Sequence, residues 1–212
     1  MKEIELETWP RRAHFEVFQK MDFPYFNLTA NVDITALRLA LRHRGASFSI
    51  GVMYLISRVA NGIPEFRTRI RGEKVIEHEV VHPSTTILTE DDLFTYCSVH
   101  YSPDFPAFQA EAEKRFAEVR ANPELHDDDW ADTLLYMTSI PWVSFTSIMH
   151  PIHLSPADSV PRFAWGKYFP EGDRIKMPLS VHGHHGLMDG VHAGRFFEQF
   201  QELADAPEDY LG

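Results

Sequence analysis

The sequence has a single cysteine, Cys97, among 212 residues, and it has no long apolar run. One cysteine excludes a disulfide within the chain and favours a reducing compartment. No segment approaches the ~20 consecutive apolar residues that a membrane-spanning helix needs, and the first residues, MKEIELETWPRR, lack an apolar signal segment. We therefore expect a cytoplasmic protein that does not bind membranes.

Positive charge is scarce, with 20 Lys and Arg residues against 31 Asp and Glu residues and a net charge of −11. This balance argues against nucleic-acid binding, which needs a basic face. An anionic ligand would need basic groups gathered locally.

Internal repeats, low-complexity segments and Pro/Gly/Ser linkers are also missing, so we expect one domain over residues 1–212. The hydrophobic content of 44% and the charged content of 24% are typical of a globular protein. Aromatic residues make up 13%, with 16 Phe, enough to fill a core and to line a pocket for a small molecule.

Apolar periodicity predicts both strands and helices. Strands are expected within 26–35, 74–88, 134–148 and 173–185, and helices within 33–45, 49–62, 105–122 and 190–207, where Asp33 is a possible helix cap. The two types alternate only in part. The expected fold is therefore an α/β or α+β layered sandwich, with a mixed sheet flanked by helices.

The stretch SVHGHHGLMDG, residues 180–190, concentrates polar chemistry at the end of a predicted strand. Alternation places Met177, Leu179, Val181, Gly183 and His185 on one face and Ser180, His182 and His184 on the other. His185 thus ends the apolar face, four residues before Asp189 in a glycine-containing turn.

A histidine at this position, near a carboxylate, suits a general base, because its ordinary pKa lies close to neutral pH. Packing in the core is the plainer interpretation of His185, and more so of His182 and His184. A metal site built from His182, His184 and Asp189 is a further alternative, although adjacent strand residues point in opposite directions.

The same stretch has the form His-His-x-x-x-Asp-Gly, here His184, His185, Asp189 and Gly190, and resembles the signature of coenzyme A-dependent acyltransferases. Further stretches resemble chloramphenicol O-acetyltransferases in order and spacing, from about Trp9 to Leu203: TWPRRAHFEVF, ANVDIT, MYLISRVAN, PEFRTRI, SIPWVSFTSI and GKYFPEGDRIKMPLSVHGHHGLMDGVHAGRF.

The resemblance implies acetyl-CoA as co-substrate, no metal, and a role for each matching residue. His185 would be the general base. Asp189 would be a structural carboxylate paired with Arg11. Ser147 would donate a hydrogen bond to the oxyanion of the tetrahedral intermediate.

The resemblance also implies two sets of binding residues and a homotrimer with active sites between subunits. Near coenzyme A it places Tyr168 and Tyr54, with Lys167 and Arg174 as candidates to offset the phosphates. Near the small-molecule acceptor it places Phe18, Phe26 and Phe94. The sequence departs from the family pattern at Ala164, where a threonine often stands, 21 residues before His185.

Three hypotheses follow. The leading one is O-acetylation of chloramphenicol or a similar hydroxyl compound, which would give antibiotic resistance by inactivation. The second is a non-catalytic binder, or an enzyme for a different acceptor, on the same scaffold. The third is a metal-dependent hydrolase that uses His182, His184 and Asp189.

Overall fold

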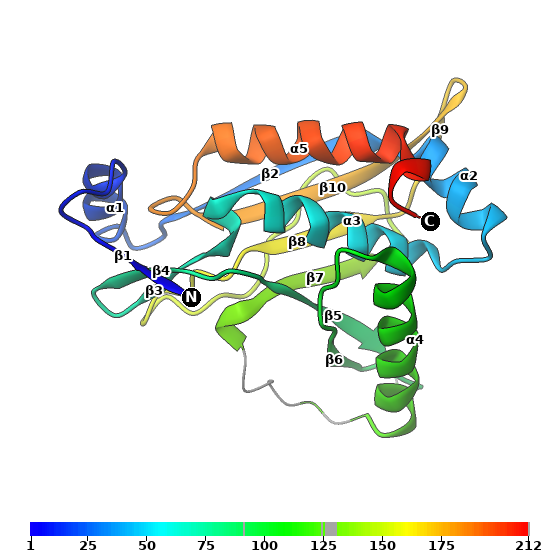
Figure 1. The fold of residues 1–212 in the computed structure, drawn as a ribbon, viewed down its shortest axis with the longest axis horizontal. Helices are drawn as coiled ribbons and strands as arrows, with labels where there is room; N and C mark the ends of the chain where they lie inside the picture. The colour runs from blue at the N-terminus through cyan, green and yellow to red at the C-terminus, as the bar shows by residue number, and fades with distance from the viewer. Residues whose placement is uncertain (91, 124, 126–130, 212) are drawn as a thin grey trace.

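In the computed structural model, which describes residues 1–90, 92–123, 125 and 131–211, one large mixed sheet organises the chain (Figure 1). It has seven strands: β2 (Tyr25–Asp33), β10 (Arg174–His184), β8 (Arg162–Gly166), β7 (Leu134–Ile140), β5 (His82–Leu88) and β6 (Phe94–Ser98) lie side by side in that order, and β9 (Phe169–Glu171) pairs with β10. Strands β5, β7 and β8 are parallel and the other neighbours antiparallel, which confirms the predicted mixed sheet.

A second, three-stranded sheet carries the N-terminal segment. It consists of β1 (Lys2–Ile4), β4 (Lys74–Glu77) and β3 (Thr68–Arg71) in that order. A small apolar cluster of Phe15, Val75 and Leu187 joins this sheet to α1 (Arg12–Phe18) and to the turn after β10. The start of the chain is thereby held against the His-His-x-x-x-Asp-Gly stretch.

The longer helices cover one face of the large sheet (Figure 1). They are α2 (Thr35–His43), α3 (Phe48–Gly62), α4 (Phe105–Ala121) and α5 (Gly190–Asp205); the short 3₁₀ helices are η1 (Pro64–Arg67), η2 (Ala131–Thr133) and η3 (Pro207–Asp209). Ser47 and Asp104 cap α3 and α4 by accepting backbone N–H groups of their first turns. Within the described residues, no helix is long and apolar enough to cross a membrane.

Strand β10 lies between β2 and β8, and its side chains alternate as the sequence predicts. Met177, Leu179 and Val181 are fully buried in the core under the helices. His182 and His184 lie on the opposite face, where the irregular segment 141–160 crosses the sheet and His150 stacks on His182 at 6.0 Å between ring centroids.

The sequence prediction and the structure are compared at three places. In the β-rich stretch 134–148, where Pro141 predicts a break, the strand ends at Ile140, because Pro141 has no N–H for the ladder. Strand β8 was not predicted, because its residues are buried on both faces and show no alternation. Helix α1 was also missed, because a helix of seven residues is too short to show a recognisable apolar periodicity.

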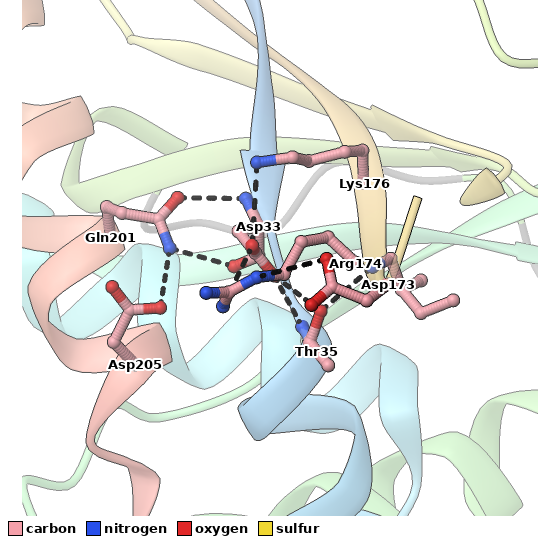
Figure 2. Close-up of polar contacts among 8 residues, drawn as sticks. Asp33, Thr35, Asp173, Arg174, Lys176, Gln201 and Asp205 are labelled. Carbon is pink, nitrogen blue, oxygen red and sulfur yellow. Dashed lines mark hydrogen bonds and ion pairs between the residues drawn. The ribbon is translucent and has the colours of Figure 1, made fainter. Parts of the chain in front are cut away.

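Through its side chain and its backbone, Asp33 joins four elements at one end of the sheet (Figure 2). Its Oδ1 accepts the backbone N–H and the hydroxyl of Thr35 at 3.0 and 2.6 Å, so it fixes the start of α2 much as the predicted cap would. Its Oδ2 lies 3.5 Å from both Arg174 and Lys176 on β10. Gln201 of α5 exchanges two hydrogen bonds with the Asp33 backbone.

Candidate active site

His185 lies in the turn directly after β10, where its ring is held between aromatic side chains. Its backbone N–H donates to the carbonyl of Pro24 at 2.8 Å. Phe18, the last residue of α1, stacks on the imidazole with ring centroids 4.0 Å apart and planes 7° apart. The ring of Phe26 packs against the imidazole in an edge-to-face arrangement, with ring centroids 5.3 Å apart. The side chain is 34% exposed, so the ring is fixed in orientation and still open to a ligand.

Arg11, the residue before α1, holds this turn through all three of its guanidinium nitrogens. Nη1 and Nη2 donate to the two carboxylate oxygens of Asp189, the first at 2.6 Å. Nη2 also donates to the carbonyl of His185 at 2.9 Å, and Nε donates to that of Gly186 at 3.0 Å. The fork geometry of arginine fits this two-oxygen pairing, which a lysine could not reproduce.

The carboxylate of Asp189 stays ionised beside His185. Hydrogen bonds from Arg11 lower the pKa of Asp189, which outweighs the partial burial that would raise it. Oδ1 of Asp189 lies 2.9 Å from Nδ1 of His185, although the ring nitrogen is not aligned for a hydrogen bond. The structure therefore brings three of the predicted catalytic residues together: His185, Asp189 and Arg11.

His182 and His184 form a separate buried cluster with His150 and Tyr25. The rings of His182 and His184 pack against the Tyr25 ring, with centroid-to-centroid distances of 5.4 and 5.2 Å. Burial lowers the pKa of His150, His182 and His184 to about 4 each, so all three rings are neutral at neutral pH.

The predicted metal ligands are not brought together. Among the residues that the structure describes, no group of three or more His, Cys, Asp or Glu side chains could hold a metal ion. Asp189 is bound to Arg11, whereas His182 and His184 pack on Tyr25. The ligand set of the hydrolase hypothesis is therefore wrong.

A cavity of about 970 Å³ lies between strands β5 to β8, helices α3 and α4, and the segment 141–160. Its walls are aromatic and hydroxyl-rich, and they include Phe94, Tyr96, Tyr136, Thr138, Trp142 and Trp165. Phe94, a predicted acceptor-binding residue, lies in the wall of this cavity. His185, Phe18 and Phe26 do not line this cavity, so one chain keeps the ring of His185 apart from it.

A smaller cleft of about 350 Å³ surrounds Tyr168, which is 39% exposed. The guanidinium of Arg38 lies 5.1 Å above the Tyr168 ring, and Phe48 meets its edge. Arg42 also lines the cleft. Arg38 and Arg42 were missed from the sequence, although their spacing of four residues on a predicted helix puts them on one face.

Lys167 precedes Tyr168 and is exposed, so it is available to a ligand of this cleft. Arg174 is less available, because it pairs with Asp33 at 3.5 Å and lies 3.9 Å from Asp173 (Figure 2). Tyr54 is fully buried, with its hydroxyl donating to the carbonyl of Pro103 at 2.6 Å. The expected contact between Tyr54 and coenzyme A therefore needs correction, because the Tyr54 ring is enclosed in the aromatic core between α3 and α4.

Ser147 lies in the segment 141–160 with an exposed side chain. The same segment supplies Trp142 and His150 to the wall of the large cavity. Ala164 is fully buried on β8, paired with Thr138 on one side and Ser180 on the other.

Comparisons with known proteins identify the family of this chain. A family model described as chloramphenicol acetyltransferase matches residues 1–201. The chain belongs to the chloramphenicol acetyltransferase family. Chloramphenicol acetyltransferase 2 of Escherichia coli is 36% identical over 204 residues, which cover 95% of this chain and 96% of that protein. Chloramphenicol acetyltransferase of Clostridium perfringens is 32% identical over 214 residues, with coverages of 99% and 97%.

Solved structures support the family at the level of the fold. A chloramphenicol acetyltransferase superposes with a TM-score of 0.86 at 28% identity, covering 96% of this chain and all of that one. A truncated catalytic core of a 2-oxoacid dehydrogenase complex from Thermoplasma acidophilum gives a TM-score of 0.68 at 19% identity, with coverages of 93% and 95%, and shares the fold. The expected acyltransferase fold is confirmed.

We predict that Arg11→Ala lowers the unfolding free energy by more than the ~1 kcal/mol typical of a surface ion pair, because Arg11 is only 13% exposed and Asp189 28%. Arg11→Lys should recover part of this loss. Arg12→Ala, which removes an exposed pair with Glu16, is the matched control. Urea unfolding measures all three, and equal losses for Arg11→Ala and Arg12→Ala would contradict the role of Arg11.

We also predict that stability falls as pH drops from about 6.5 to 4. In this range the unfolded chain protonates its histidines while His150, His182 and His184 stay neutral in the fold, so protons favour unfolding. Each histidine contributes up to ~1.4 kcal/mol per pH unit. Urea midpoints at several pH values should show a shallower slope for His182→Asn. The control His43→Asn, at an exposed position, should leave the pH dependence of the urea midpoint unchanged. An unchanged pH dependence in His182→Asn would contradict this prediction.

Proposed function

We propose that this protein transfers the acetyl group of acetyl-CoA to a hydroxyl of chloramphenicol, with His185 as the general base. The observation that carries the proposal is the His185 ring, stacked on Phe18 in a turn that Arg11 and Asp189 hold, in a chain of the chloramphenicol acetyltransferase family. Acetylation removes the hydroxyl of the drug, so the activity would confer resistance by inactivation.

In the proposed reaction, an imidazole nitrogen of His185 takes the proton from the acceptor hydroxyl as its oxygen attacks the thioester carbonyl carbon. The tetrahedral intermediate carries a negative oxygen, to which Ser147 donates a hydrogen bond. When the intermediate collapses, the C–S bond breaks and the imidazolium returns its proton to the thiolate. The ionised Asp189 beside the ring favours the imidazolium in the intervening state.

The cleft around Tyr168 is the proposed site for coenzyme A. Its exposed aromatic ring offers a face for stacking an adenine, and Arg38 and Arg42 line the same cleft. Together with the exposed Lys167, they supply local positive charge for the phosphates of coenzyme A, which the net charge of −11 would otherwise repel.

The acceptor site is proposed to form between two copies of the chain in a homotrimer. The large cavity contains Phe94 but lacks His185, while Phe18 and Phe26 contact His185 outside the cavity. A single chain therefore holds the base and the cavity of about 970 Å³ in separate places. A partner subunit that supplies its His185, Phe18 and Phe26 to the mouth of the cavity would complete the site.

The first prediction from this proposal concerns the base. His185→Ala should lower kcat at least ~100-fold, since general base catalysis contributes 10²–10⁴-fold. The assay is chloramphenicol-dependent release of coenzyme A thiol from acetyl-CoA, with His14→Ala on the exposed side of α1 as the control. A His185→Ala variant with near-normal turnover would refute the base assignment.

The second prediction concerns the shared site. Thr138→Trp should block the cavity and His185→Ala should remove the base, so each variant alone is inactive. Co-assembled in equal amounts, they should recover about a quarter of the sites, because one cavity in four then faces an intact His185 across a cyclic interface. Unfolding and reassembly of the mixture, followed by the thiol assay, gives the measurement. No recovery would show that each chain works alone.

The alternative is a non-catalytic binder, or an enzyme for another acceptor, on the same scaffold. The observation behind this alternative is Ala164, which stands where the family often has a threonine. Chloramphenicol binding without thiol release would support the binder. Thiol release with a different hydroxyl compound would support another acceptor.

A further inference from the structure

His192, the third residue of α5, connects the active-site turn to η1. Its Nδ1 accepts the backbone N–H of Asp189 at 2.9 Å, the position that Glu or Gln holds in a capping box. Its Nε2 lies 3.3 Å from Oε1 of Glu65 in η1. The ring is 11% exposed and the Glu65 side chain 29%, so the pair is largely shielded from water.

This geometry specifies one tautomer of His192. A ring nitrogen that accepts a hydrogen bond carries no hydrogen, so the neutral ring has its hydrogen on Nε2, facing Glu65. The opposite tautomer would set an N–H on Nδ1 against the N–H of Asp189 and leave a lone pair facing the carboxylate. Glu65 therefore selects the tautomer that Asp189 requires.

Burial is the main influence on the pKa of this ring, and it favours the neutral form. Burial lowers the pKa of His192, and Arg11 and Arg195 act in the same direction, against the opposing charges of Glu65 and Asp189. Protonation of Nδ1 would also break the hydrogen bond from Asp189.

Asp189 is thus fixed from two sides. Its side chain is bound by Arg11, which also binds the carbonyl of His185, and its backbone is bound by His192. Both constraints are needed to keep its carboxylate 2.9 Å from the ring of His185. Misplacement of a catalytic group by an ångström can lower the rate by about 10²-fold.

We propose that Glu65 and His192 are positioning residues: Glu65 sets the tautomer of His192, and His192 orients Asp189 beside the catalytic ring. The inference rests on the proposed transfer reaction, because it assigns the pair to that reaction's base. Neither side chain contacts the ring of the base itself; both act through Asp189.

Two variants separate the contacts of His192. His192→Asn keeps an acceptor near the Nδ1 position and loses Nε2, whereas His192→Leu keeps a side chain of similar size and loses both nitrogens. We expect His192→Leu to lower kcat about 3–10-fold, the worth of one hydrogen bond, with both KM values within about twofold of wild type. His192→Asn should keep most of kcat. Equal kcat values in both variants would overturn the role of the Asp189 contact.

A double-mutant cycle tests Glu65. Glu65→Ala should lower kcat about twofold or more in the wild-type background, because only the fraction of chains with the correct His192 tautomer then positions Asp189. In His192→Asn it should have no further effect, because asparagine has no tautomer to select. Additive losses would overturn the role assigned to Glu65.

A stability control excludes a general effect. Nε2 of His78 also lies 3.3 Å from a carboxylate, that of Asp132, in a pair that does not contact Asp189. His78→Asn should lower Tm while leaving kcat unchanged. A kcat loss in His78→Asn equal to that in His192→Leu would mean that destabilisation alone explains both, and would overturn the proposal.

Nitrogen NMR of the histidine rings gives a readout that does not need activity. The wild type should show His192 with hydrogen on Nε2 only, and Glu65→Ala should show a mixture of tautomers. A single unchanged tautomer in Glu65→Ala would overturn the role of Glu65, whereas a wild type that shows the expected tautomer but turns over no acceptor would overturn the proposed function instead.

Discussion

The guanidinium of Arg11 is the contact on which the candidate site depends. It spans 178 residues of sequence to reach Asp189 and uses the remaining donors on two successive carbonyls of the turn. The apolar cluster of Phe15, Val75 and Leu187 holds α1 and the small sheet against that turn, so the arginine arrives in place through packing. A charge pair of this kind, partly shielded from water, has few alternative partners and therefore fixes the turn in one arrangement.

The two faces of β10 serve different purposes. The face under the helices is apolar and anchors the strand in the core. The other face carries His182 and His184, neutral and packed on Tyr25 against the segment 141–160. His185 belongs to neither layer, because the strand has already ended. Its orientation comes from Phe18 and Asp189, which lie on separate segments of the chain.

Much of this could be predicted from local patterns. The alternation in β10 and the helical periods of α2, α3, α4 and α5 follow from single stretches of sequence, and the His-His-x-x-x-Asp-Gly spacing locates His185 and Asp189. What could not be predicted depends on distant segments. Tyr54 resembles a binding residue in sequence but is enclosed by α4, the pairing of Arg174 with Asp33 joins two strands, and the Glu65–His192 contact joins η1 to α5.

The position of β10 in the sheet has a consequence for synthesis of the chain. Residues 174–184 pair on one side with β2, which is made early, and on the other with β8. Until the ribosome has released β10, both strands have an unpaired edge, and such edges attract other chains. The ion pair of Arg11 likewise cannot form until Asp189 has been synthesised. The nascent chain therefore stays exposed to misassembly until β10 is available to pair with both strands.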